Sequence, residues 1–249
     1  MSVLPRQFAA RVTLLRDRVP GFDEYPFSLP VVRTLESIEL HPRMTFLVGE
    51  NGSGKSTLLE AMAVALEFNP EGGSRNFAFG TRESHSELHE YLRIAKGVRP
   101  RDGFFLRAES WFNVGTEIEH LDSEGGGPPI IAAYGGRSLH EQSHGESFMA
   151  LLKNRFHGNG LYLLDEPEAA LSPARQIEAL QRFHELVRQD SQFVIATHSP
   201  ILMAYPDALI LQCTPNGIRP VRYEDTEHFR ITRDFLLHRD KVLAILMER

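Results

Sequence analysis

The chain contains few cysteines, no long apolar run and no excess of positive charge. Its 249 residues include one cysteine, Cys213, so no intramolecular disulfide can form and stability must come from packing. Cys213 ends the apolar run 208–213, which predicts a small buried side chain and not a reactive thiol. No stretch approaches the roughly 18 to 20 apolar residues of a membrane span, and the N-terminus lacks a signal-peptide core. We therefore expect a cytoplasmic protein with no transmembrane segment.

The overall composition is that of an ordinary globular protein. The formal net charge is −6, which gives no support to a partner held by whole-chain positive charge, although a local basic patch stays compatible with it. Hydrophobic residues make up 42% and charged residues 24% of the chain, far from a disordered or fibrous composition. A chain of this length can form one large α/β domain.

The apolar pattern predicts an α/β fold. Continuous apolar runs at 44–48, 161–164, 193–196 and 208–211 indicate strands that are covered on both faces of a sheet. Helical segments lie between them at 55–66 and 173–188, and Ser172 and Pro173 are suited to the N-cap and first turn of the second helix. The alternation of strands and helices predicts a mostly parallel sheet flanked by helices.

The sequence also predicts an inserted subdomain and a C-terminal helix. The range of about 71–150 is rich in Gly, Ser, Arg and His, and we interpret it as a smaller subdomain inserted into a single domain that spans residues 1–249. The range 227–249 carries apolar residues at helical spacing, including Phe229, Phe235 and Val242. We expect this C-terminal helix to pack back on the body.

A glycine-rich loop after the first strand matches the phosphate-binding pattern G-x-x-x-x-G-K-[ST]. It follows the strand 44–48 and opens the helix at Lys55, which is the context that this motif requires. Backbone N–H groups and a lysine would hold the phosphates, and Ser56 would place its hydroxyl on Mg²⁺. The predicted nucleotide-binding residues here are Gly49, Glu50, Asn51, Gly52, Ser53, Gly54, Lys55, Ser56 and Thr57. Predicted cofactors are therefore ATP and Mg²⁺.

Two acids end the strand 161–164. The carboxyl ends of parallel strands form the ligand-binding edge of such a sheet, so Asp165 is predicted to hold Mg²⁺. If the backbone is still extended at Glu166, that side chain points away from Asp165 and can polarise the attacking water. We predict a metal ligand in Asp165 and a catalytic base in Glu166.

The order of motifs resembles that of ABC-type P-loop ATPases. The segment 165–173 looks like their Walker B motif and D-loop, and its Asp-Glu-Pro-Glu wording is similar to that of the RecF, SMC and OLD-like branch. His198, after the strand 193–196, looks like the switch histidine of the family. The segment 142–146, Gln-Ser-His-Gly-Glu, looks like its signature motif.

The resemblance implies a mechanism that uses two copies of the chain. Ser143 and the N–H groups of Gly145 and Glu146 open a helix, whose N-terminus attracts anions. In the family, the signature of one protomer closes over the γ-phosphate that the other protomer binds, which implies a homodimer on ATP binding. His198 would donate a hydrogen bond to the γ-phosphate and act with Glu166 in catalysis.

Three positions depart from the family's pattern or stay open. Glu109 stands where a glutamine that helps to bind the metal is expected, and it either replaces that glutamine as a metal ligand or is purely structural. His144 takes the place of a signature glycine. Tyr25 and Phe27 could stack on the adenine, although core packing is the expected role of each.

The sequence leaves the purpose of ATP hydrolysis open. The first hypothesis is a stand-alone soluble ATPase of the RecF, SMC and OLD-like group, whose ATP-driven dimerisation acts on a nucleic acid or an effector protein. The segment between Glu109 and Ser143 is too short for the coiled coil of SMC proteins. The alternative is the nucleotide-binding subunit of a membrane transporter, which the missing glutamine disfavours. A regulatory ATP sensor is a third hypothesis, which intact Glu166 and His198 disfavour.

Overall fold

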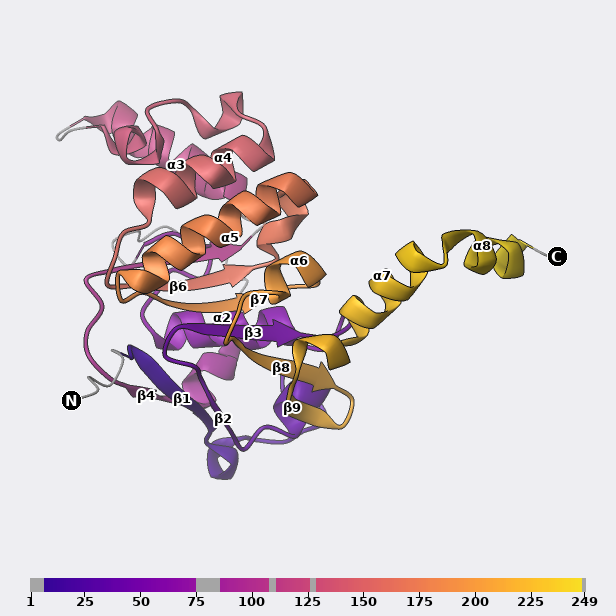
Figure 1. The fold of residues 1–249 in the computed structure, drawn as a ribbon. Helices are drawn as coiled ribbons and strands as arrows, with labels where there is room; N and C mark the ends of the chain where they lie inside the picture. Colours follow the sequence, from indigo (N-terminus) through magenta and orange to yellow (C-terminus); the bar gives the residue numbers. More distant parts are fainter. Residues whose placement is uncertain (1–6, 75–85, 108–110, 126–128, 248–249) are drawn as a thin grey trace, which may run out of the picture.

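The computed structural model describes residues 7–74, 86–107, 111–125 and 129–247. In this part of the chain the central element is a six-stranded sheet with the order β5-β6-β7-β3-β8-β9 (Figure 1). Its strands are β3 (Met44–Val48), β5 (Asp102–Arg107), β6 (Gly160–Asp165), β7 (Gln192–Ala196), β8 (Leu209–Thr214) and β9 (Gly217–Val221). All neighbouring pairs are parallel except β8 and β9. The predicted α/β class with a mostly parallel sheet is confirmed.

A second, antiparallel sheet of three strands has the order β2-β1-β4. Its strands are β1 (Ala9–Leu14), β2 (Ser37–Glu39) and β4 (Leu92–Lys96). The Gln192 side chain joins the two sheets, because its Oε1 accepts the N–H groups of Phe8 and Ala9 at 3.0 Å and its Nε2 donates to the Ala9 carbonyl. The sequence did not predict this sheet, since its strands are short and only half apolar.

Helices cover both faces of the large sheet, as its continuous apolar strands predicted. α2 (Lys55–Ala65) and the small sheet enclose one core, which includes Leu47 and Leu163. α5 (Pro173–Arg188) encloses the other core, which includes Phe46 and Phe193. Ser172 caps α5 by accepting the Arg175 N–H, as predicted. The shorter helices of the body are α1 (Pro30–Arg33), α6 (Pro200–Met203) and the 3-10 turns η1 (Arg16–Arg18), η2 (Glu87–Tyr91), η6 (Pro167–Ala170) and η7 (Tyr223–Asp225).

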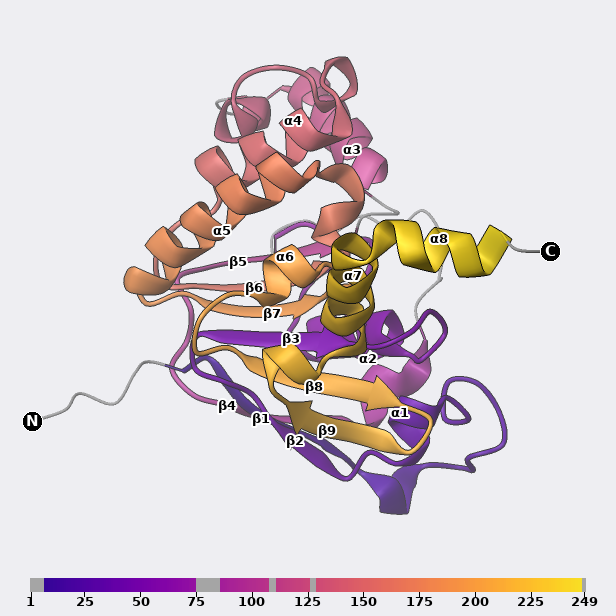
Figure 2. The same ribbon diagram turned by 45° about the vertical axis from the view of Figure 1, so that its right-hand side comes forward.

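A helical lobe stands above the β5 edge of the sheet (Figures 1 and 2). It contains α3 (Trp111–Glu124), α4 (His144–Ala150), a π-helical turn η5 (Leu151–Arg155) and the 3-10 turns η3 (Ile130–Tyr134) and η4 (Leu139–Glu141). The predicted insertion 71–150 also contains β4 and β5, which lie in the two sheets. The helical lobe therefore spans the narrower range from α3 to η5.

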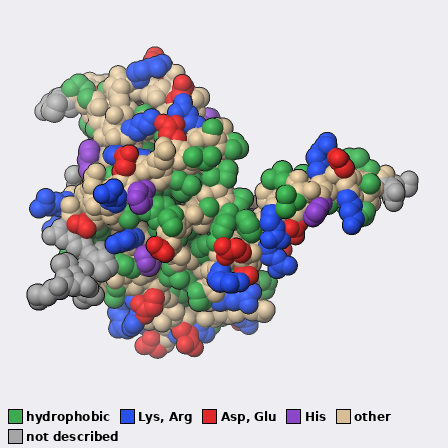
Figure 3. Space-filling model, in the orientation of Figure 1, with side chains coloured by type: hydrophobic (Ala, Val, Ile, Leu, Met, Phe, Trp, Pro, Cys, Tyr) green, Lys and Arg blue, Asp and Glu red, His purple; other side chains and the backbone are tan. Residues whose placement is uncertain are grey.

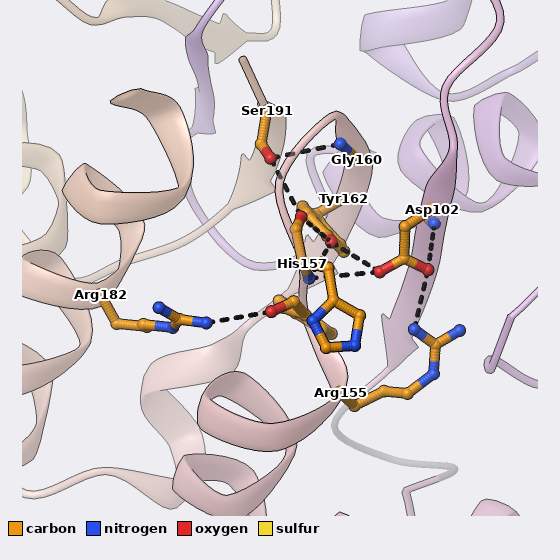
Figure 4. Close-up of polar contacts among 9 residues, drawn as sticks. Asp102, Arg155, His157, Gly160, Tyr162, Arg182 and Ser191 are labelled. Carbon is orange, nitrogen blue, oxygen red and sulfur yellow. Dashed lines mark hydrogen bonds and ion pairs between the residues drawn. The ribbon is translucent and has the colours of Figure 1, made fainter. Parts of the chain in front are cut away.

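A partly buried polar network anchors the end of this lobe to the sheet (Figure 4). Arg155, at the end of η5, forms an ion pair of 2.7 Å with Asp102 at the start of β5. The other oxygen of Asp102 accepts the Tyr162 hydroxyl at 2.8 Å and the His157 N–H at 3.2 Å. Arg182 of α5 donates to the Phe156 carbonyl. Because a charge in a partly buried position is destabilising when it loses its partner, this network helps to fix where the lobe leaves the sheet.

The C-terminal segment does not pack back on the body, so that prediction is wrong. It forms α7 (Glu227–Leu237) and α8 (Arg239–Met247), which extend away from the sheet as an arm (Figures 1 and 2). Neither helix contains a buried residue, and Leu236 is 69% exposed. Apolar side chains stay visible along the arm (Figure 3). Helical spacing predicted the helices correctly, but spacing cannot specify which surface covers an apolar face.

No helix in the described ranges has the length and hydrophobicity that crossing a membrane requires.

Candidate nucleotide site

The phosphate-binding loop joins β3 to α2 and needs glycine at two tight positions. Gly54 is the N-cap of α2 with φ of 96°, and a Cβ there would lie 2.4 Å from Val31 Cγ1. Gly49 has φ of 151°, and a Cβ there would lie 2.4 Å from the Cys213 carbonyl oxygen. Any larger residue would displace the loop from its neighbours in α1 and β8. The two glycines therefore fix the loop against the body.

Lys55 holds this loop from inside. Its Nζ is buried and donates to the carbonyl oxygens of Gly49 at 2.8 Å and Glu50 at 2.9 Å. Burial lowers the pKa of Lys55, and nearby carboxylates, Glu166 and Asp165 among them, oppose that effect. The ammonium group thus lies beside the loop, at the N-terminus of α2. Both features favour a negatively charged ligand.

Ser56 and Asp165 meet although they are far apart in sequence. The Ser56 hydroxyl on α2 donates to Asp165 Oδ1 at 2.9 Å, at the carboxyl end of β6. Hydroxyl and carboxylate oxygens suit Mg²⁺, which proteins usually hold through one or two carboxylates together with phosphate oxygens. Among the described residues, no group of three or more His, Cys, Asp and Glu could hold a metal ion by itself. The third predicted metal ligand, Glu109, lies outside the described residues.

Glu166 takes a backbone conformation that the sequence did not predict. The strand ends at Asp165, and Glu166 is left-handed with φ of 48° and ψ of 50°, so the assumption of extended backbone is wrong. Its N–H donates to the Ala196 carbonyl at 2.9 Å. Such a conformation is costly for a residue other than glycine and persists only where the surroundings impose it. The turn places the half-exposed carboxylate toward the loop after β7.

His198 lies in that loop and faces Glu166. Its Nε2 is 3.4 Å from Glu166 Oε1 and is buried without a well-formed hydrogen bond. Burial lowers the pKa of His198, and the charge of Lys55 lowers it further, while Glu166 opposes the change. The neutral imidazole is favoured, so Nε2 can donate a single hydrogen bond into the site.

Sequence reasoning missed two residues that hold His198. Glu168 is half-buried and accepts the His198 backbone N–H at 2.5 Å, and burial of its carboxylate raises its pKa. The second glutamate of the Asp-Glu-Pro-Glu motif, Glu168, was a usable signal for this role. His228 of α7 places its Nε2 3.0 Å from His198 Nδ1. Because His198 and His228 are 30 residues apart, no local sequence pattern predicted that contact.

The predicted signature residues begin α4 in the helical lobe. Ser143 is the N-cap and accepts the Glu146 N–H, while the Glu146 carboxylate accepts the Ser143 N–H at 3.0 Å and its hydroxyl at 2.8 Å. These hydrogen bonds lower the pKa of Glu146. Gly145 packs against η6, because a Cβ there would lie 2.8 Å from the Ala170 carbonyl oxygen. The capping carboxylate already occupies part of the helix end where an anion was predicted.

The lobe and the phosphate-binding loop lie on different sides of the sheet. α4 is on the side of α5, whereas α2 covers the opposite face (Figures 1 and 2). Between α4 and η6 there is a small pocket whose lining includes His144, Phe148, Glu166 and Ala170. The exposed His144 therefore lies near the catalytic candidate Glu166 of its own chain.

The two aromatic residues before the loop have different surroundings. Phe27 is buried and makes an edge contact with Tyr91, with ring centroids 4.9 Å apart, so its predicted core role is confirmed. Tyr25 is 63% exposed, so the expectation of core packing is wrong there. Cys213 is buried as predicted, and burial raises the pKa of its thiol to about 11.

Comparisons with known proteins agree with this geometry. A family model described as an AAA domain matches residues 27–117, which include the phosphate-binding loop. An uncharacterized ABC transporter ATP-binding protein of Haemophilus influenzae is 24% identical over 64% of this chain and 65% of its own length. The hemin import ATP-binding protein HmuV of Pseudomonas aeruginosa is 29% identical over 71% of this chain and 76% of its own length.

A solved structure shares the fold. The ATP-binding cassette MJ1267 of an ABC transporter matches with a TM-score of 0.54 and 17% identity, and the match covers 93% of this chain and 97% of MJ1267. Fold, family model and relatives all indicate a nucleotide-binding protein. The chain therefore shares its fold with an ATP-binding cassette, and both relatives are ABC transporter or import ATP-binding proteins by name.

Proposed function

We propose that the chain binds and hydrolyses ATP with Mg²⁺, and that two copies of it close around the nucleotide. The observation that carries the proposal is the meeting of three neighbouring strand ends, β3, β6 and β7. They bring together the buried Lys55 ammonium, the Ser56–Asp165 pair and the Glu166–His198 pair. Each pair is a donor or ligand set that phosphoryl transfer uses.

The first part of the mechanism is the capture of the phosphates. Lys55 exchanges its hydrogen bonds with the Gly49 and Glu50 carbonyls for bonds to phosphate oxygens. Ser56 and Asp165 would hold Mg²⁺, which when bound neutralises charge on the β and γ oxygens. The N–H groups of the loop and the N-terminus of α2 stabilise the remaining charge.

The second part is the activation of water. Glu166 has a half-exposed carboxylate that can accept a proton from a water in the site. His198 offers a buried Nε2 that lies 3.4 Å from an oxygen of that same carboxylate. A γ-phosphate within reach of His198 would accept the Nε2–H hydrogen bond, while Glu166 orients the water for attack.

Closure by a second copy accounts for the position of the lobe. Ser143, Gly145 and Glu146 begin α4 on the α5 side of the sheet, whereas Lys55 and Ser56 begin α2 on the opposite face. In a head-to-tail homodimer the three α4 residues would face the partner's phosphate-binding loop. The Glu146 carboxylate would have to turn away from Ser143 to admit a phosphate there.

The test is the rate of phosphate release by the full chain with Mg-ATP. In Glu166→Gln, ATP affinity should be kept while the rate falls about 10²- to 10⁴-fold, which is the usual contribution of a positioned base. Glu36→Gln, at an exposed position distant in sequence, is the matched control and should retain the rate. Equal rates in wild type and Glu166→Gln would refute the assignment of the base.

The relatives favour a second candidate role for the hydrolysis. Those reported above are named ATP-binding proteins of ABC transporters, and a transporter subunit is the role that their names suggest. The stand-alone role in the RecF, SMC and OLD-like group, with a nucleic acid or an effector protein as partner, rests on the Asp-Glu-Pro-Glu motif at 165–168.

An ATPase assay with added partners separates the two roles. Stimulation by double-stranded DNA or by single-stranded nucleic acid supports the stand-alone role. Stimulation that needs a membrane fraction and is lost on extraction of integral proteins supports the transporter role.

A further inference from the structure

The arm and the switch histidine meet at a pair of imidazole rings. His228 lies in the first turn of α7, and its Nε2 is 3.0 Å from Nδ1 of His198. The two rings are tilted by 63° with centroids 5.1 Å apart. His198 and His228 are 30 residues apart in the sequence, so their contact depends on where α7 packs on the body.

Hydrogen bonds and ring packing fix the position of the first turn of α7. Thr226, the N-cap of α7, is fully buried, and its hydroxyl donates to the Tyr223 carbonyl at 2.7 Å. The Tyr223 hydroxyl donates to the Pro200 carbonyl at 2.9 Å, two residues after His198, and the Tyr223 ring packs on Phe229. The first turn of α7 is therefore fixed to the switch loop, although the rest of the arm is exposed.

The hydrogen bond between the rings restricts the tautomer of His198. A neutral imidazole has one donor and one acceptor nitrogen, and the bond made by one nitrogen decides which proton the other carries. A lone pair on Nε2 would face the Glu166 carboxylate, which is unfavourable, and could not serve a phosphate. The favourable arrangement has Nε2 protonated and Nδ1 accepting from His228.

The charged groups around His228 are compatible with that arrangement. Lys55 disfavours a positive charge on either ring, and burial acts in the same direction. Glu227 and Glu50 have the opposite effect on His228. A neutral His228 with its proton on Nε2 supplies the donor that His198 Nδ1 needs.

We propose that His228 is a positioning residue, which holds His198 as the Nε2–H tautomer and thereby ties ATP hydrolysis to the seating of the C-terminal arm. This role rests on the proposed function of His198. The influence of His228 on hydrolysis would pass through its contact with His198.

Two variants of the full chain separate the donor from the ring. His228→Phe keeps a ring of similar shape and removes the donor, whereas His228→Gln keeps an N–H donor near the position of Nε2. With Mg-ATP, His228→Phe should lower kcat by about tenfold or more, the worth of one lost hydrogen bond, while the Kd for ATP changes much less. His228→Gln should recover most of kcat. A wild-type kcat in His228→Phe, or an equal loss in both variants, would overturn the proposal.

A spectroscopic readout tests the same bond without any activity. ¹H–¹⁵N correlation spectra of the nucleotide-free protein distinguish the two tautomers of His198, and the signal is assigned by its loss in His198→Asn. We expect the Nε2–H tautomer in wild type and His228→Gln, and a mixture in His228→Phe. A Nδ1–H tautomer in wild type, or no change in His228→Phe, would overturn the positioning role. If wild type shows the expected tautomer and yet does not hydrolyse ATP, the proposed function fails and the positioning of His198 stands.

Discussion

The nucleotide edge of the sheet and the C-terminal arm differ in how far their side chains are buried. At the edge, Lys55 and Asp165 are buried and held by specific hydrogen bonds. Along α7 and α8, large apolar residues such as Leu236 are left exposed, and no residue of either helix is buried. The two regions meet where His198 contacts His228.

This difference in burial shows which of the two regions contributes to the stability of the fold. The edge is formed by the fold itself, because its groups come from adjacent strand ends and from the helix that covers them. The described part of α7 and α8 contains no buried residue, so most of its side chains contribute little to the stability of the single chain. Substitutions that are matched between the two regions should therefore have very different effects.

The largest expected contrast concerns stability. Phe193 in β7 is fully buried and packs against Tyr162 and Phe183, so Phe193→Ala should lower the free energy of unfolding by about 3–5 kcal/mol. The exposed Leu236→Ala on the arm should change it by less than about 0.5 kcal/mol. Urea denaturation followed by circular dichroism measures both. A large loss in Leu236→Ala would mean that the arm packs on the body in solution.

The second contrast concerns nucleotide binding. Lys55→Ala should remove Mg-ATP binding, a loss of at least about 100-fold in affinity, because a charge-assisted contact to the phosphates disappears. Lys241→Ala on the arm is the matched control and should keep the wild-type Kd. Isothermal titration calorimetry decides the matter. Unchanged affinity in Lys55→Ala would contradict the assignment of the phosphate-binding loop.

A third experiment compares the edge with the helical lobe. Ser143→Arg should keep ATP binding and lose hydrolysis, because the residue would act on the nucleotide of the partner. When it is mixed with Lys55→Ala, each mixed dimer contains one site with an intact loop and an intact signature, so part of the activity should return. An absence of activity at every mixing ratio would count against sites that two copies share.

The smallest expected effect is the pH dependence of stability. Burial lowers the pKa values of His198 and His228 in the folded protein. The unfolded chain therefore binds more protons as the pH falls below about 6.5, and the free energy of unfolding should fall with it. His228→Phe should flatten this decline, whereas His238→Phe at an exposed position of the arm should not. Urea titrations at several pH values between 5 and 8 measure the slopes.

The edge was predictable from sequence because its signals are local. The strand 44–48 and the helix 173–188 were predicted at the bounds that the structure has, and the positions of Gly49 to Ser56 follow from one motif. Asp165 and Ser56 were expected to share a metal, and the structure brings them within 2.9 Å of each other. A buried strand or a phosphate-binding turn needs little information from the rest of the chain.

The remaining features depend on contacts that no local pattern encodes. The left-handed turn at Glu166 follows from its bond to Ala196 on the neighbouring strand. The seat of His228 against His198 depends on where α7 leaves the body, and the exposure of the arm depends on the absence of a covering surface among the described residues. The small antiparallel sheet was missed because short half-apolar strands give a weak signal.

The most direct test of the account is the mass of Glu166→Gln in solution, measured by size-exclusion chromatography with light scattering. This variant should bind Mg-ATP, hydrolyse it slowly and therefore accumulate as a closed dimer, with a shift that depends on nucleotide concentration. Without nucleotide it should run as a monomer or a weaker dimer, and the Glu166→Gln, Lys55→Ala double variant should not respond to ATP. A Glu166→Gln protein whose mass never changes with Mg-ATP would contradict the claim that two copies close around the nucleotide.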